Sequence, residues 1–425
     1  MIARWLTVPL SVAQRLVRRG FPAISVAGMT VIAVTLTIVW PPVVGKIGWA
    51  LPHDLWGTMV AAHRVLHGQL SGLYTRPTGL ITLPGGALIL VPIVAVIDAA
   101  RLSLHVPGPD ARPVIWLLAG PYEAAISGIA VFAADAIAEH LAVPRLKRAV
   151  LAVASAVALW NVTIRWGHPE DAVAVGLLMY SMLELARGRT GRSAWLFGFA
   201  VAVQPLVLLG LPVALAVMNP RRAARYVGVA ATPGVVLLGV AAIANWHATW
   251  VAVTRQPNWP SIDHPTLWLP LATPLHGGAV AAGPARVIAI VVAGGCAVAA
   301  GFACRSARDA ETWDAGTLLR LLWWIAVTMA LRSVFEPVMV AYYAWPVFAV
   351  GLVTAITTWP RLLATSAVAG TLTFASQAPW RNPWAWWVPM VAGLAVTLLL
   401  AVPWRPVAED VSGSRGYRSE APATL

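Results

Sequence analysis

Long apolar stretches alternate with short polar segments along most of the chain. A helix needs roughly 20 apolar residues to cross a bilayer. Stretches of about this length lie near 25–48, 113–137, 149–165, 168–186, 222–244, 284–304, 317–334, 337–357, 362–379 and 385–403. Backbone polar groups inside a bilayer need internal partners, so segments of this kind are helical. The pattern predicts an all-α polytopic membrane protein with about 10–12 transmembrane helices.

Two further apolar stretches are interrupted by proline, which removes a backbone donor and breaks a continuous helix. Residues 79–97 contain a Pro84-Gly-Gly sequence, and residues 193–218 contain Gln204-Pro205. We expect 79–97 to lie in the interface or re-enter. We expect 193–218 to rise as far as Gln204-Pro205 and then return. This arrangement puts a larger share of the 30 basic residues inside, as the positive-inside rule requires, and every histidine except His140 outside.

The same pattern predicts the organisation of the chain. Residues 1–24 form a cytoplasmic segment ahead of an uncleaved first span. Residues 25–404 form the transmembrane domain, with outer loops at 49–112 and 245–283. Residues 405–425 form a polar, disordered cytoplasmic tail. The predicted location is the cell membrane, with both termini cytoplasmic and the active site on the outer face.

Composition narrows the class of protein. Of the 425 residues, 59% are hydrophobic and 11% are charged, whereas soluble domains carry about 25% charged residues. This excludes a soluble enzyme, a disordered regulator and a fibrous protein. The net charge of +13 comes from clusters between apolar runs, which indicates contact with membrane lipid and no nucleic-acid partner. Cys296 and Cys304 lie in or at the end of one apolar run and are predicted to be lipid-buried thiols outside any disulfide framework.

The first outer loop holds the first carboxylate of the chain, Asp54, preceded by His53. The sequence from Pro52 to Asp54 predicts a helix start with Asp54 at or near the N-cap. Apolar residues then recur at helical spacing, which predicts an amphipathic helix on the membrane surface: Met59, Ala62, Leu66 and Leu70. Asp54 is expected to cap this helix, to accept a proton from a sugar hydroxyl, or to do both.

A second polar group, Arg165-Trp-Gly-His168-Pro-Glu170-Asp171, separates two apolar runs. Ionisable residues beside membrane spans are costly and tend to be functional. One interpretation is a polar turn in which Glu170 and Asp171 cap the next helix. The other is a His and carboxylate pair that orients a sugar or a phosphate-bound divalent metal.

Two more breaks are candidate sites. Gln204-Pro205 is either a helix kink or a place where freed backbone groups and an amide bind phosphate or sugar. Further along, Arg332 and Glu336 are four residues apart and precede Tyr342-Tyr343. These are either an interfacial ion pair with an aromatic belt, or a site in which Arg332 neutralises a lipid phosphate.

The second outer loop contains His247 and His264. Each is either an ordinary interfacial side chain or a contact to the phosphate of a donor lipid. No internal repeat is evident, so the sequence gives no support for an inverted-repeat transporter.

The order of these features resembles the GT-C superfamily of integral membrane glycosyltransferases. Within it, the chain is most similar to the actinobacterial polyprenol-phosphate-mannose-dependent mannosyltransferases. The resemblance covers most of 25–350 and rests on the order of short motifs: Asp54, Gly68 and Tyr74 in the first outer loop, His168-Pro-Glu-Asp171, Gly198 to Gln204-Pro205, and Glu336-Pro with Tyr342-Tyr343. It implies a hexosyltransferase that moves mannose from a polyprenyl-phosphate donor to a glycan or glycolipid acceptor of the cell envelope, with inversion and without a nucleotide cofactor.

The resemblance implies that Asp54 is the catalytic base. It implies substrate-binding roles for the other candidates: His53, His168, Glu170, Asp171, Gln204, His247, His264, Arg332, Glu336, Tyr342 and Tyr343. The chain departs from the family in two places. Gln204 stands where those enzymes carry a lysine, and Asp54 is a single carboxylate instead of an acidic pair.

Two other functions stay open. A transporter or flippase for a polyprenyl-linked sugar would use carboxylates within the bilayer, for which Glu123, Asp135 and Glu184 are the candidates. A non-catalytic assembly subunit could keep the same fold.

Overall fold

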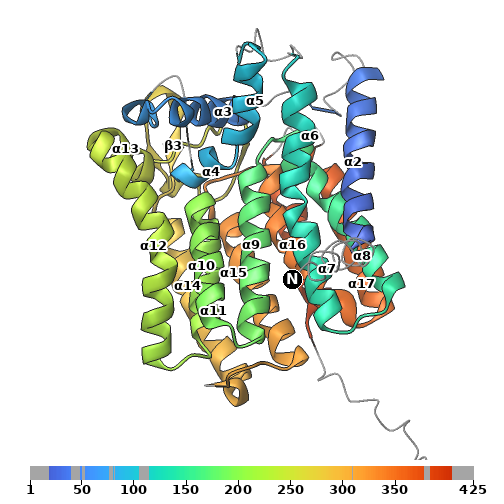
Figure 1. The fold of residues 1–425 in the computed structure, drawn as a ribbon. Helices are drawn as coiled ribbons and strands as arrows, with labels where there is room; N and C mark the ends of the chain where they lie inside the picture. Colours follow the sequence, from blue (N-terminus) through green and yellow to red (C-terminus); the bar gives the residue numbers. More distant parts are fainter. Residues whose placement is uncertain are drawn as a thin grey trace, which may run out of the picture.

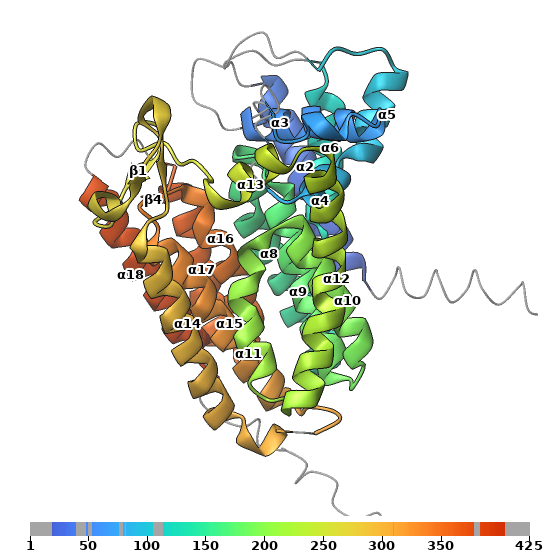
Figure 2. The same cartoon turned by 90° about the vertical axis from the view of Figure 1, so that its left-hand side faces the viewer.

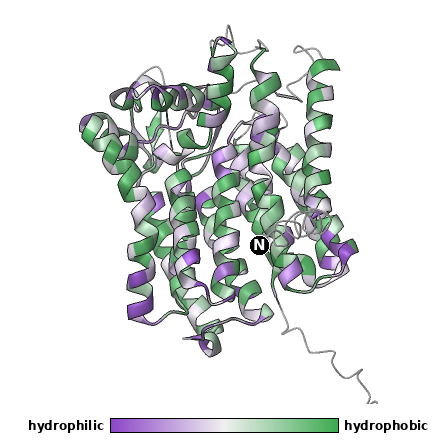
Figure 3. Ribbon diagram, in the orientation of Figure 1, coloured by the Kyte–Doolittle hydropathy of each residue, from purple (hydrophilic) through white to green (hydrophobic). Residues whose placement is uncertain are grey.

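The computed structural model describes residues 19–39, 48–49, 53–75, 80, 82–104, 114–308, 310–377 and 383–403. Helices make up nearly all of its regular structure (Figure 1). Seven helices in this part of the chain are long and apolar enough to cross a membrane. Hydrophobic residues cover most of their length (Figure 3). The prediction of an all-α polytopic membrane protein is therefore confirmed at this level.

The longer helices pack side by side in a bundle. Their bounds are α2 Gly20–Val39, α6 Trp116–Ser127, α7 Ile129–His140, α8 Arg145–Trp160, α9 Pro169–Ala186, α10 Thr190–Val203, α12 Pro220–Ala244, α14 Pro284–Ala303, α15 Ala315–Phe335, α16 Trp345–Thr354, α17 Trp359–Ala375 and α18 Pro383–Ala401.

Short elements gather at one end of this bundle (Figures 1 and 2). They come from both predicted outer loops: α3 His53–Leu66, α4 Pro84–Leu88, α5 Val91–Ala99, α13 Trp246–Thr254, β1 His264–Pro265, β2 Thr273–Pro274 and β3 Val280–Ala281. β2 pairs with β3, and β1 pairs antiparallel with β4 (Val338–Met339). The second pairing ties the loop 245–283 to the chain that follows α15.

Neither α4 nor α5 is long enough to cross a bilayer. α4 packs against α10, and a Cβ atom on Gly85 would overlap the carbonyl oxygen of Ala202. Glycine is therefore required here for the backbones of α4 and α10 to approach each other.

The helix α10 stops at Gln204, whose backbone is extended (φ −149°, ψ 115°). The short helices η5 (Pro205–Gly210) and α11 (Leu211–Leu215) follow. Figure 2 shows this segment running back along the bundle, where α11 packs against α14 and η5 against α15. The break therefore leaves the end of α10 and the start of η5 next to the short elements at the end of the bundle.

Two sequence predictions, those for 337–357 and for Leu66, need correction. The apolar stretch 337–357 is not one helix, because Val338 and Met339 pair with β1 and α16 begins only at Trp345. The stretch 113–137 is confirmed as part of one candidate span, Trp116–His140, in which a turn at Gly128 divides α6 from α7. Leu66, expected on the apolar face of α3, is 38% exposed.

Candidate functional site

His168 lies between two carboxylates. Its Nδ1 is 2.8 Å from Oε1 of Glu170, and its Nε2 is 3.4 Å from Oδ2 of Asp54. The side chains of His168 and Glu170 are 2% and 3% exposed, whereas that of Asp54 is 43% exposed. The arrangement is a buried pair that supports one accessible carboxylate, and it joins the first turn of α3 to the start of α9.

Local sequence explains this turn. Gly167 adopts a left-handed backbone (φ 63°), and Pro169 occupies the first turn of α9. His168 is thereby fixed at the N-cap position, and Glu170 and Asp171 fall in the first helical turn. Burial alone would lower the pKa of His168, but the charges of Glu170 and Asp54 outweigh burial and raise it.

Aromatic rings cover the other side of His168. The ring of Tyr342 stacks on it with centroids 4.1 Å apart, and Tyr343 packs edge-on against Tyr342. The guanidinium of Arg332 lies 4.3 Å from the ring centroid of Tyr343, a cation–π distance. The predicted tyrosine pair is therefore buried in the site instead of forming an exposed aromatic belt.

Asp171 and Gln204 connect the site to the break after α10. The Gln204 amide donates to Oδ1 of Asp171 at 2.5 Å, and both side chains are buried. An amide donor suits a carboxylate that cannot reach water. The break at Gln204-Pro205 is thus part of the site, and the amide of Gln204 is already bonded to protein.

Arg332 and Glu336 form the predicted i, i+4 pair only loosely, at 4.0 Å. The stronger partner of Glu336 is Arg286, whose Nη2 donates to Oε1 at 2.7 Å. Arg286 is 44% exposed, whereas the side chain of Glu336 is 5% exposed. Arg286 therefore presents a cation that the sequence did not single out.

A cavity of about 390 Å³ lies between η5, α11, α14 and α15. One group of its lining residues is polar: Gln204, Gln256, Arg286, Arg332 and Glu336. The other is apolar: Pro205, Leu206, Leu208, Leu209, Pro212, Ala289, Ile290, Ala293 and Phe335. Ile290 on α14 is 57% exposed. The cavity therefore suits an amphiphile with an anionic head and an apolar tail.

Asp263 was missed in the sequence because it lies in an irregular, proline-rich loop with no motif around it. The negative charge of Asp54 and the positive charge of His168 both act on it. Burial, together with the charge of Asp54, raises the pKa of Asp263 to about 6. Asp54, the single carboxylate of its motif, thus has a second carboxylate nearby that comes from the other outer loop.

His247 and His264 do not join this group. His247 is exposed on α13, and among the residues that the structure describes it has no polar contact with the site. His264 stacks on Trp386 with centroids 4.0 Å apart, and burial lowers its pKa. Its role in the fold is to hold β1 against α18. His53 begins α3, but its side chain lies outside the described residues.

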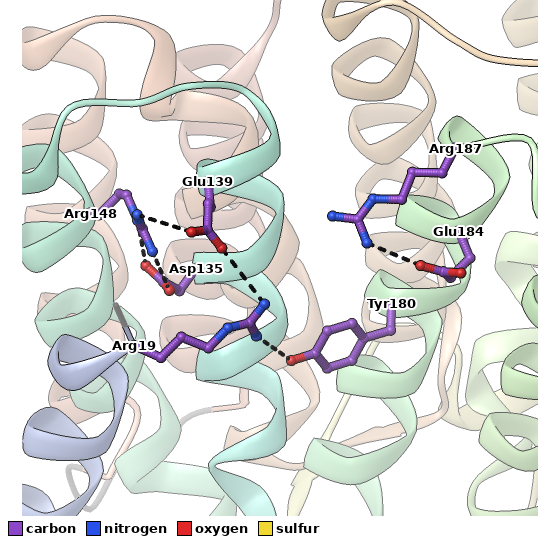
Figure 4. Close-up of polar contacts among 7 residues, drawn as sticks. All are labelled: Arg19, Asp135, Glu139, Arg148, Tyr180, Glu184 and Arg187. Atoms are coloured by element: carbon purple, nitrogen blue, oxygen red, sulfur yellow. Dashed lines mark hydrogen bonds and ion pairs between the residues drawn. The ribbon is translucent and has the colours of Figure 1, made fainter. Parts of the chain in front are cut away.

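The three carboxylates considered for a transporter lie on three different helices, α6, α7 and α9. Asp135 accepts two hydrogen bonds from Arg148, at 2.8 and 2.7 Å (Figure 4). Glu184 pairs with Arg187 and Arg189. Glu123 is fully buried on α6 and lies within electrostatic range of Glu170 and His168. Two of the three are thus already neutralised by arginine.

Comparison with known proteins adds no assignment. The chain matches no family model, no curated protein and no solved structure. Function has to be argued from the geometry of the site.

Proposed function

We propose that the protein is a membrane glycosyltransferase that moves a sugar, mannose by its resemblance, from a polyprenyl-phosphate donor to a glycan or glycolipid acceptor of the cell envelope. One observation carries the proposal. A half-exposed carboxylate, Asp54, is supported by a buried His168–Glu170 pair, and Asp171 and Gln204 connect this group to a cavity shaped for an amphiphile. A lipid-linked sugar phosphate has the polarity that such a cavity fits.

The donor would place its phosphate near Arg286 and Arg332 and its isoprenoid chain along the apolar lining. Arginine binds phosphate through several N–H donors. Arg286 offers the cationic contact that the family resemblance assigns to the lysine replaced here by Gln204. The departure at Gln204 is therefore compatible with donor binding.

The reaction would begin when Asp54 accepts the proton of an acceptor hydroxyl. The hydroxyl oxygen attacks the anomeric carbon, and the bond from that carbon to the phosphate oxygen breaks. The electron pair leaves with the polyprenyl phosphate, whose charge the arginines stabilise. Attack opposite the leaving group inverts the anomeric configuration. The residues named here need no nucleotide or redox cofactor for this step.

The experiment is a transfer assay on membranes that contain the protein, with radiolabelled polyprenyl-phosphate mannose and candidate lipid-linked glycans. Label that moves from the donor to the acceptor supports the proposal. Label that crosses sealed vesicles still attached to its lipid identifies a flippase. If folded protein, tested over a range of sugars, shows neither transfer nor translocation of label, the non-catalytic assembly subunit is favoured.

Arg286→Gln tests the donor site in the same assay. It removes a charge-assisted contact of about 1.5–3 kcal/mol, so we expect KM for the donor to rise roughly 10- to 100-fold. Arg305→Gln is the control, because Arg305 is exposed and outside the cavity. An unchanged KM in Arg286→Gln would show that the donor phosphate binds elsewhere.

A further inference from the structure

Two histidines and an aspartate converge at the outer-loop end, away from the site around Asp54. His63 and His67 are four residues apart on α3 and therefore share one face of the helix. Their Nε2 atoms lie 3.7 and 3.3 Å from the two carboxylate oxygens of Asp98 on α5. One ligand atom from each residue lies within 4.8 Å of the others.

We propose that His63, His67 and Asp98 bind a zinc-type divalent metal ion. Zinc takes imidazole nitrogen at about 2.0–2.1 Å and carboxylate oxygen at about 2.0–2.2 Å in tetrahedral geometry. Two ligands of such an ion are therefore separated by about 3.3–3.5 Å. The His67–Asp98 separation of 3.3 Å matches this value. The His63–Asp98 separation of 3.7 Å runs to the other carboxylate oxygen and is slightly longer, so the side chains must adjust to bring three ligand atoms to one ion.

The fold holds these ligands in place before any ion binds. The buried face of α3 packs in one apolar cluster with α5, through Met59, Ala62, Val94 and Ile97. The indole of Trp56 donates to the carbonyl oxygen of Leu104 at 2.8 Å, which fixes α3 to the chain after α5. The three ligand side chains are 35%, 42% and 46% exposed, so an ion and a water molecule as fourth ligand reach them from solvent.

The ligand set selects the class of ion. Imidazole suits zinc and similar transition metals, whereas magnesium and calcium prefer sites made mainly of oxygen. The site is also separate from the proposed reaction. His63 lies nine positions after Asp54 on α3, which corresponds to about 14 Å along the helix axis. The ion would therefore act by clamping α3, the helix that carries Asp54, to α5.

The test measures zinc bound to the purified full-length protein, prepared in detergent with an affinity tag that contains no histidine. We expect one zinc ion per chain in the presence of excess magnesium, and a rise in Tm on adding zinc. His67→Gln and Asp98→Asn should each weaken zinc binding at least about tenfold and remove the rise in Tm. His247→Gln, an exposed histidine on α13, should bind zinc as the wild type does.

Three results would overturn the proposal: no zinc bound by the wild type, equal binding by His67→Gln and Asp98→Asn, or loss of binding in His247→Gln. Failure of the wild type to bind would mean that the three side chains form only histidine–aspartate ion pairs. Near-isosteric variants of partly exposed residues keep the fold, which gel filtration and circular dichroism verify. Sugar transfer is not measured, so the result is independent of the proposed function.

Discussion

At the scale of single residues, this candidate site differs from the sequence motifs of the family that the chain resembles. Gln204 keeps the break after α10, but its side-chain amide is hydrogen-bonded to Asp171. Arg286 brings a cation to the same cavity from α14. Asp263 adds a carboxylate near Asp54 from a distant loop. In each case the partner is remote in sequence, so the chemistry depends on the fold that brings them together.

The stability of the folded protein should depend on pH through Asp263, whose pKa is raised to about 6. A carboxyl group with a raised pKa in the folded state binds more protons there than in the unfolded chain. It therefore lowers stability as the pH rises from about 4 through 6. We expect Asp263→Asn to be more stable than the wild type at pH 8, by on the order of 1–2 kcal/mol after allowance for partial exposure.

Thermal unfolding in detergent between pH 4 and pH 8 measures this effect. The gain should disappear near pH 4, where Asp263 is protonated and resembles asparagine. Glu311→Gln, at an exposed position, is the matched control and should show no such trend. A stability difference that does not vary with pH would contradict the assigned cause.

The sequence predicted most of the site residues but not their contacts. The group from Arg165 to Asp171 was recognisable because ionisable residues interrupt apolar runs. His168, Glu170 and Asp171 are indeed buried together. Asp263 and Arg286 carried no such signal, because a lone charge in a polar loop or at a helix start is common. Their significance comes only from tertiary contacts.

At the scale of elements, the length of the apolar stretches located helices, including the span Trp116–His140, and erred at some of their ends. It extended α16 backward over Val338 and Met339, which are apolar in a short strand as well as in a helix. The prediction that proline breaks the helix was more accurate, since α10 stops where Gln204-Pro205 begins.

The contact between α4 and α10 yields a test at this scale. Gly85→Ala places a methyl group against the backbone of Ala202. We expect a loss of about 1–3 kcal/mol in unfolding free energy, as for other overpacked positions. Gly239→Ala in α12 has open space around the new methyl group and should be neutral or stabilising. Chemical denaturation of both variants checks the prediction, and equal stabilities would contradict the close approach.

At the scale of the whole molecule, the two ends of the bundle differ. Short elements from both predicted outer loops occupy one end, whereas η8 (Arg305–Ala307), which follows α14, lies toward the other (Figure 2). The charge pattern predicts that the first end faces outward.

Cysteine labelling tests this orientation in intact cells. The background carries Cys296→Ala and Cys304→Ala, which removes both native thiols. We expect a membrane-impermeant maleimide to label His276→Cys from outside, and Arg305→Cys only after permeabilisation. Both positions are exposed, but His276 lies between β2 and β3 of the predicted outer loop, whereas Arg305 follows the far end of α14. The reverse pattern would contradict an outward-facing site.

In the proposed reaction, Asp54 removes the proton from the acceptor hydroxyl. The most direct measurement is the rate of mannose transfer by purified Asp54→Asn, with donor binding measured on the same sample and Glu311→Gln as control. We expect a fall in kcat of about 10²- to 10⁴-fold, unchanged donor affinity and a fully active control. A folded Asp54→Asn protein that transfers sugar at the wild-type rate would contradict this role of Asp54.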